Sequence, residues 1–168
     1  YDQPTWVGSG TPGDPYCLRL NGRGNYVEVP GAGGINPADG FTIEVLARVR
    51  QQSLVQEEMA PFLAVGNMGN TGDFNLQIRS GGPADSLYLN TQFLGSVGRI
   101  LNTGPKFAVP ENSFTHFLYT YDPQASARSK WFANGRLMGS DPRLIQAGKN
   151  TAPINIGSHQ SGRRHRLH

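Results

Sequence analysis

Apolar and polar residues alternate along several stretches of the chain. Between residues 41 and 50 one face would carry Phe41, Ile43, Val45, Ala47 and Val49, and the other Thr42, Glu44, Leu46, Arg48 and Arg50. Residues 74–79 and 86–92 alternate in the same way, and residues 114–121 are rich in aromatic and β-branched side chains. Because successive side chains of a strand point to opposite faces of its sheet, this period of two predicts half-buried strands.

Shorter runs of the same kind predict further strands. They cover residues 16–20, 26–29, 61–65, 129–133 and 154–156. Asn21-Gly22 and Asn134-Gly135 are typical of tight hairpin turns, residues 80–85 link two alternating runs, and Asp122-Pro123-Gln124 opens another turn. About nine short strands separated by turns are typical of two packed antiparallel sheets, so the sequence predicts an all-β sandwich.

The length and composition fit one such domain. A chain of 168 residues can bury its own core, and 22 glycines and 12 prolines agree with many turns. We expect an extended, polar lead-in over residues 1–15, the sandwich over 16–158 and a basic tail over 159–168. No apolar run is long enough to span a bilayer, and the first residues lack the features of a signal peptide.

The charge distribution argues against nucleic acid as a partner. The formal net charge of +3 comes from Arg163, Arg164 and Arg166, near the end of the chain. Without them 12 basic residues (15 − 3) balance 12 acidic ones, so the body of the domain has no basic surface. The lone Cys17 cannot form an internal disulfide, and we expect it to be a small buried residue of a strand.

Five segments resemble, in order, motifs of the laminin-G-like, concanavalin A-like lectin/glucanase domains. They are residues 18–30, 41–44, 114–122, 131–137 and 154–157. The third segment, from Phe114 to Asp122, is similar to the family's W-x-H-V-A-x-T-Y-D strand, with His116 at the histidine, whose usual role there is structural hydrogen bonding. The resemblance implies an antiparallel jelly-roll sandwich that acts as an extracellular recognition module.

The resemblance also implies two features at the edges of the fold. In the family a strand of the type F-x-G-x-I-D-E-V-R-I-Y follows the last segment, and it does not occur before His168. We therefore expect an open sheet edge, which would allow pairing with another protein. Family members often hold calcium near the rim through an Asp at the position of Asn25. With Asn25 there and no last strand to supply further groups, such a site would have fewer carboxylates and bind Ca²⁺ more weakly. A second candidate cation site is the loop over residues 66–73, with Asp73 and the Asn carbonyls as ligands; the alternative is a plain loop.

Polar residues at the outward positions of the strands form the candidate ligand site. If one sheet carries them together, its polar face presents Glu44, Arg48, Asn75, Gln77, Arg79, Tyr88, Asn90 and Gln92. Planar polar groups bind sugar hydroxyls and an aromatic ring stacks on the C–H face of a sugar, so this face is a candidate site for a polysaccharide or glycan. Trp131 is a candidate stacking platform. The alternative is a solvated sheet face without a ligand, and a half-buried structural Trp131.

A glycoside hydrolase on the same fold is the competing interpretation. Such an enzyme needs two carboxylates, which on one strand face means an E-x-E or E-x-D-x-E spacing, and no such spacing occurs. A cross-strand pair of Glu44 with Asp73 or Glu111 stays open. The sequence thus favours a recognition module without catalytic residues, in a secreted, periplasmic or cell-surface protein. Its expected ligand is carbohydrate, and a protein-protein adhesion or assembly domain is a second alternative.

Overall fold

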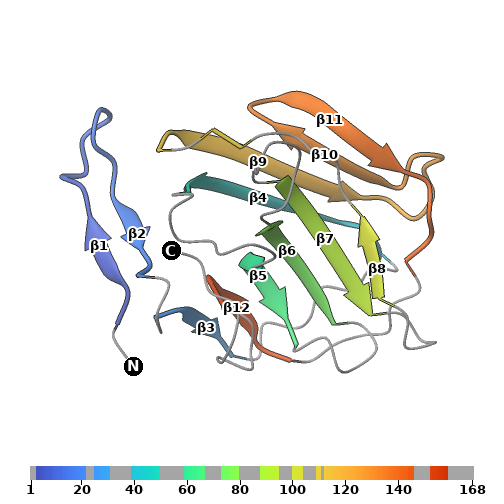
Figure 1. The fold of residues 1–168 in the computed structure, drawn as a ribbon, viewed down its shortest axis with the longest axis horizontal. Helices are drawn as coiled ribbons and strands as arrows, with labels where there is room; N and C mark the ends of the chain where they lie inside the picture. The colour runs from blue at the N-terminus through green and yellow to red at the C-terminus, as the bar shows by residue number, and fades with distance from the viewer. Residues whose placement is uncertain are drawn as a thin grey trace.

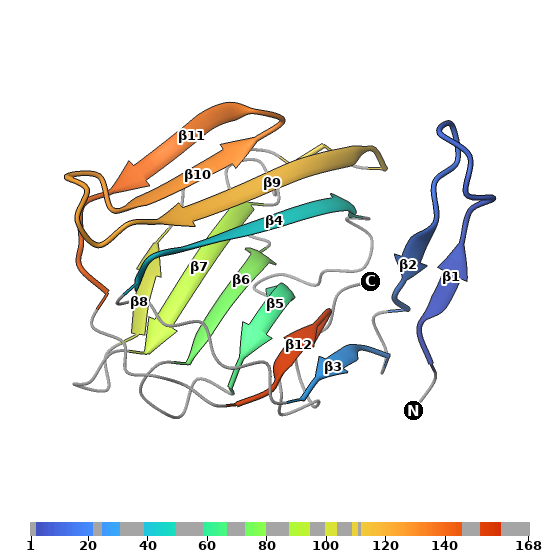
Figure 2. The same ribbon diagram turned by 180° about the vertical axis from the view of Figure 1, so that it is seen from behind.

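The computed structural model describes residues 3–21, 25–30, 39–49, 59–66, 73–79, 88–94, 100–103, 109–110, 112–145 and 152–158. Twelve strands in this part of the chain form three antiparallel sheets (Figure 1, Figure 2). The strands are β1 (Thr5–Val7), β2 (Cys17–Arg19), β3 (Val27–Val29), β4 (Phe41–Arg48), β5 (Met59–Val65), β6 (Phe74–Arg79), β7 (Tyr88–Leu94), β8 (Ile100–Thr103), β9 (Phe114–Tyr121), β10 (Ser129–Ala133), β11 (Arg136–Asp141) and β12 (Ile154–Ile156).

Two of these sheets make the sandwich. One has the order β11-β10-β9-β4 and the other the order β3-β12-β5-β6-β7-β8, while β1 and β2 form a separate hairpin beside them (Figure 2). The predicted all-β fold with two packed antiparallel sheets is confirmed. Both sheets are open, and β4 has a strand neighbour on one side only within the described residues.

All nine predicted strands are present, and three more were missed. Strand β1 lies within the predicted lead-in, and β8 is only four residues long. Strand β11 was not predicted, because its sequence Arg-Leu-Met-Gly-Ser-Asp has no clear alternation of apolar and polar residues. Its pairing with β10 also shifts register between Trp131 and Phe132. The predicted basic tail lies outside the described residues.

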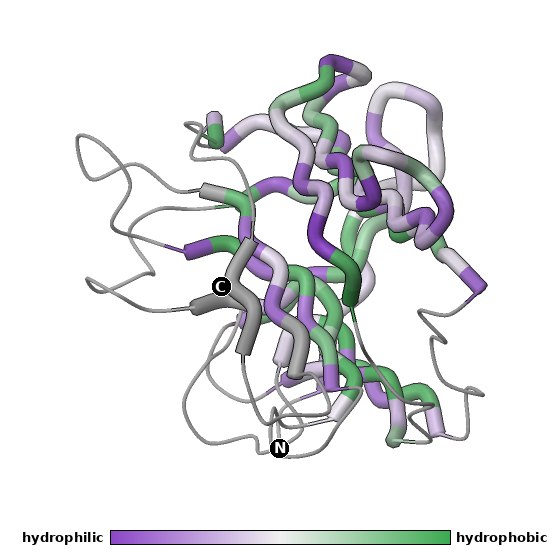
Figure 3. Tube along the Cα trace, turned by 90° about the vertical axis from the view of Figure 1, so that its right-hand side faces the viewer, coloured by the Kyte–Doolittle hydropathy of each residue, from purple (hydrophilic) through white to green (hydrophobic). Residues whose placement is uncertain are grey.

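Aromatic side chains join the two sheets across the core. Phe41 of β4 packs edge-on against Phe74 of β6 with ring centroids 5.5 Å apart, and Phe74 lies 6.1 Å from Tyr119 of β9. Tyr119 in turn contacts Trp131 of β10 at 5.4 Å. Figure 3 shows the underlying pattern, with apolar and polar residues alternating along the strands.

Trp131 is part of this core and not of a ligand-binding surface. Its side chain is 1% exposed, which leaves no ring face for a sugar to stack on. The prediction of a stacking platform at Trp131 is therefore not supported. The alternation in β10 explains why: Trp131 shares the inward face with Ser129, directly across from Tyr119.

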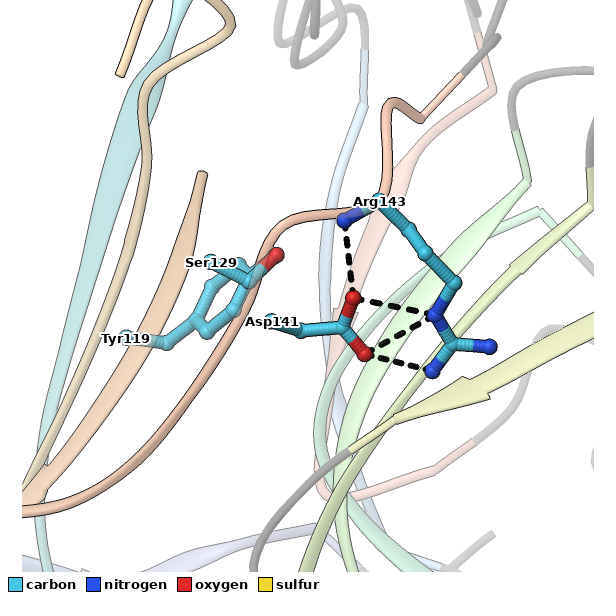
Figure 4. Close-up of polar contacts among 4 residues, drawn as sticks. All are labelled: Tyr119, Ser129, Asp141 and Arg143. Atoms are coloured by element: carbon cyan, nitrogen blue, oxygen red, sulfur yellow. Dashed lines mark hydrogen bonds and ion pairs between the residues drawn. The ribbon is translucent and has the colours of Figure 1, made fainter. Parts of the chain in front are cut away.

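A polar cluster fixes the chain where it leaves the four-stranded sheet (Figure 4). Tyr119 Oη lies 3.0 Å from Ser129 Oγ, and burial raises the pKa of the Tyr119 hydroxyl well above its usual value. Beside it, Arg143 Nε donates to both carboxylate oxygens of Asp141 at 2.9 Å. This hydrogen bonding holds the pKa of Asp141 below its ordinary value. The cluster orders the segment that follows β11.

Two glycines with left-handed backbones differ in their surroundings. Gly135 completes the predicted Asn134-Gly135 hairpin turn between β10 and β11, with a φ of 77° and open space where a Cβ would lie. Gly157, after β12, has a φ of 85°, and a Cβ there would lie 2.1 Å from Leu20 Cδ1. Only the second position combines backbone strain with a steric conflict.

We expect the two alanine substitutions to separate these effects. Gly135→Ala should lower the free energy of unfolding by about 1–2 kcal/mol, because a Cβ disfavours the left-handed region. Gly157→Ala carries the same backbone cost and also overlaps Leu20, so its loss should be larger by about 1 kcal/mol or more. Urea unfolding measures both. Equal losses would show that Leu20 repacks freely and would contradict the expectation.

Candidate functional site

The outward face of the six-stranded sheet carries neutral amides at its centre. In β6, alternation turns Phe74, Leu76 and Ile78 toward the core and Asn75 and Gln77 to the opposite face. Strand β6 pairs with β5 on one side and β7 on the other. Its two amides therefore lie in the middle of the sheet rather than at an edge.

Neighbouring strands place more amides beside these two. Asn75 is in register with Gln92 of β7, and Gln77 with Asn90. On the other side Asn75 is in register with Ala64 of β5, which faces Asn155 of β12. We call these five side chains the amide face: Asn75, Gln77, Asn90, Gln92 and Asn155. Sequence alternation predicted the first four. Asn155 was missed because Ile154–Ile156 is too short to show which side faces outward.

The amide face is buried and only partly paired. Asn75 Nδ2 donates to Gln92 Oε1 at 3.0 Å, and Gln77 Nε2 donates to Asn90 Oδ1 at 2.9 Å. All five side chains are less than a tenth exposed. Hydrogen bonds between neighbouring strands thus hold the orientation of four of the five amides.

Asn155 and Asn75 retain hydrogen-bonding capacity that the protein does not use. Both Nδ2 and Oδ1 of Asn155, and Oδ1 of Asn75, are buried and make no hydrogen bond within the described part of the chain. Leaving such an atom unpaired costs about 1–3 kcal/mol. Ala64 of β5 lies between Asn155 and Asn75, and its side chain is only a methyl group. Donor and acceptor atoms thus flank a small residue at the centre of the sheet.

Replacing these amides by leucine should show which of them stabilise the fold. Asn155→Leu removes two unpaired buried atoms, so we expect the free energy of unfolding to stay equal or to rise by about 1–2 kcal/mol. The matched change Asn90→Leu removes the acceptor of the bond from Gln77 and should lower it by about 1–2 kcal/mol. Urea unfolding compares the two. A loss at Asn155 as large as that at Asn90 would contradict the assignment.

Arg79 lies at the end of β6, on the same side as the amide face. It is in register with Tyr88 of β7 and Met59 of β5. The residue is half-buried, and its Nε is buried without a hydrogen-bond partner in the described part of the chain. For Tyr88 the structure gives the backbone position only, so its side chain lies outside the described part of the chain.

Glu44 and Arg48 lie on the other sheet, so the prediction that one sheet carries all eight residues is wrong for these two. They belong to β4, and their side chains are on the outward face of the four-stranded sheet. Glu44 Oε1 is 2.7 Å from His116 Nε2, and Arg48 lies over the ring of Phe114 at 5.4 Å. Alternation gives the face of a strand, but long-range pairing with β9 decides its sheet.

The pairing of Glu44 with Asp73 does not form. Asp73 immediately precedes β6 in the six-stranded sheet, and its carboxylate lies against Gly66, where a Cβ would be 1.9 Å from Oδ1. Glu44 is on the far side of the core, next to His116. The other candidate, Glu111, lies outside the described residues.

The two predicted calcium ligands have local contacts instead. Asn25 is 4% exposed; its Oδ1 accepts a hydrogen bond from the Asn21 backbone at 2.7 Å, and its Nδ2 donates to the Gln3 carbonyl. Asp73 is 1% exposed. No three His, Cys, Asp or Glu side chains gather as a metal site among the described residues. Calcium binding at Asn25 and Asp73 therefore stays a prediction.

Comparison with known proteins identifies a family. The family model described as the concanavalin A-like lectin/glucanases superfamily matches residues 21–166. No curated protein matches the sequence.

The described residues contain no helix of the length and hydropathy needed to cross a membrane.

Several solved structures share the fold at low sequence identity. One of them is domain 4 of an extracellular arabinanase from Geobacillus stearothermophilus, in complex with arabinotriose. Its sequence is 14% identical, the TM-score is 0.63, and the alignment covers 93% of this chain. The chain spans 66% of that structure's length. The CBM40 domain of a Ruminococcus gnavus sialidase, bound to α2,3-sialyllactose, is 17% identical with a TM-score of 0.56, covering 84% of this chain and 82% of its own.

A third structure extends the same likeness. The binding domain of Paraclostridial Mosquitocidal Protein 1 is 16% identical with a TM-score of 0.66, covering 96% of this chain and 39% of its own. At these identities the similarity shows a shared fold.

Proposed function

Since the chain belongs to the concanavalin A-like lectin/glucanases superfamily, we propose that it is a carbohydrate-binding module whose ligand binds at the amide face. The observation that carries the proposal is the unused hydrogen-bonding capacity of Asn155 and Asn75 in the middle of this face. A sugar hydroxyl both donates and accepts, so a row of hydroxyls can satisfy amide nitrogens and oxygens alike. A ligand of this kind recovers the cost of burying them unpaired.

The spacing of the strands would suit a sugar ring over Ala64 once the face has opened, because the Ala64 side chain is itself 0% exposed. Neighbouring strands lie about 4.8 Å apart, so the backbones of β12 and β6 are roughly 10 Å apart on either side of β5. A ring over the Ala64 methyl group would have Asn155 on one side and Asn75 on the other. The bond from Asn75 to Gln92 fixes the orientation of one of these amides before the ligand arrives.

Burial of the face adds a step to binding. The five amides are less than a tenth exposed, so a saccharide reaches them only in a conformation in which the face is more open. The free energy of this opening reduces the apparent affinity by the fraction of molecules that are open. We therefore expect a modest affinity for a single site.

The relatives support the ligand class. The arabinanase domain and the CBM40 domain have this fold and hold arabinotriose and sialyllactose. A carbohydrate-binding function also fits a secreted, periplasmic or cell-surface location. The hydrolase alternative is weaker, because Glu44 pairs with His116 on the opposite sheet, away from the amide face.

Alanine substitutions test the proposal. Asn155→Ala and Asn75→Ala should each weaken binding about tenfold, the equivalent of about 1.4 kcal/mol, because each removes hydrogen bonds to the ligand. Ala64→Leu should abolish binding by occupying the place of the ring. Calorimetric titration with a panel of arabino-, xylo-, gluco- and galacto-oligosaccharides identifies the ligand and measures the changes.

Two variants on the other sheet serve as controls. Thr42→Ala and Glu44→Gln lie on the outward face of the four-stranded sheet and should bind with unchanged affinity. Affinity that is indifferent to Asn155, Asn75 and Ala64 but lost on changing Glu44 would refute the amide face as the site. Turnover of an oligosaccharide that Glu44→Gln abolishes would instead support the hydrolase.

A further inference from the structure

Arg79 has no anionic partner among the residues that the structure describes. Its Nε is buried and unpartnered, and the structure gives the guanidinium no ion pair or hydrogen bond within the described part of the chain. By contrast, Arg143 is paired with Asp141, and Arg128 donates to the carbonyl of Pro123. A buried donor on a charged group costs more to leave unpaired than a neutral one.

The carboxylates nearest to β6 among the described residues do not meet this need. Asp73 lies six residues away at the other end of β6, about 20 Å along the strand. Glu28 of β3 is exposed at the edge of the sheet, three strands from β6. Between these ends the face consists of uncharged amides. The partner of Arg79 therefore has to come from outside the described residues.

We propose that Arg79 selects a glycan that carries an anionic group, a carboxylate or a sulfate. The inference rests on the proposed function and names the class of its ligand. The guanidinium offers two parallel N–H donors that match a carboxylate or sulfate, and such charge-assisted pairs are roughly twice as strong as neutral hydrogen bonds. The amides contact hydroxyls and Arg79 contacts the anion.

The distance between the two groups sets the minimum length of the ligand. Arg79 is four residues from Asn75 along β6, about 13 Å. One sugar ring over Ala64 does not extend that far. The ligand is therefore an oligosaccharide that follows β6, with its acidic unit near Arg79 and a neutral unit near Asn155 and Asn75.

Matched pairs of saccharides test this on the full 168-residue chain. Each pair differs only in the anion: oligogalacturonates and their methyl esters, sialyllactose and lactose, and a sulfated oligosaccharide and its desulfated form. We expect an acidic member to bind at least tenfold more tightly than its neutral partner, and to weaken as NaCl is raised because ions screen the pair. The carboxylate and sulfate pairs show which anion is recognised.

Variants of Arg79 assign the preference. Arg79→Gln should remove the difference between pair members, while Arg79→Lys should retain part of it, since lysine keeps the charge and loses the two-pronged geometry. Arg136→Gln, which removes an exposed charge from β11 of the other sheet, is the matched control and should change nothing. Thermal unfolding checks that each variant is folded.

The outcomes separate the two proposals. Neutral and acidic members bound equally well, or a preference that survives Arg79→Gln, would overturn this inference and leave the carbohydrate-binding function in place. Binding of no saccharide by the wild-type chain would overturn both. A preference for acidic members that depends on Arg79 and also falls in Asn155→Ala supports both.

Discussion

The structure depends on a single strand that is buried on both of its faces. One face of β6 inserts Phe74, Leu76 and Ile78 into the core, where Phe74 meets Phe41 and Tyr119 of the opposite sheet. The other face carries amides that pair with β7. Because successive side chains of a strand point to opposite faces, a one-residue shift of β6 against its neighbours would turn its amides into the core and its apolar side chains to the opposite face. The core therefore fixes the register of the polar face.

This coupling explains how a site arises from distant parts of the sequence. Asn155 reaches the amide face only because β12 inserts between β3 and β5, far from its neighbours in sequence. The left-handed Gly157 directly after β12 packs against Leu20, and its backbone N–H donates to Phe62. Backbone pairing with β3 and β5 holds Asn155 in position, and its side-chain amide makes no hydrogen bond within the described residues.

The sequence predicted which side chains share a face of a strand more reliably than it predicted the sheet to which each strand belongs. The alternation of β4 and β6 was predicted correctly, and so was the placement of one set of residues on a common outward face: Asn75, Gln77, Arg79, Asn90 and Gln92. Glu44 and Arg48 were placed on the wrong sheet, because strand pairing is a long-range property that period-two patterns do not contain. Trp131 was taken as a candidate stacking platform, but the alternation of β10 turns it inward beside Tyr119 of the neighbouring strand, where it is 1% exposed.

The same limit explains why Asn155 was missed. Three residues are too few to show a period, and its outward side follows only from its pairing with β3 and β5. By contrast, the hairpin at Asn134-Gly135 was predictable, because the turn is local and requires two residues that tolerate positive φ. A turn can be predicted from the two residues that form it, whereas the pairing of strands far apart in the sequence cannot be predicted from a local pattern.

The absence of ionisable groups from the amide face has a consequence for the setting in which the protein works. Amides keep the same donors and acceptors across the whole ordinary pH range. Contacts made by these groups are then insensitive to acidity on the protein's side. Only an acid on the ligand could titrate, for a carboxylate near pH 4 and below. Amide contacts to uncharged hydroxyls would therefore be as strong in an acidified medium as in a neutral one, and only the recognition of a carboxylate would weaken as the medium becomes more acidic.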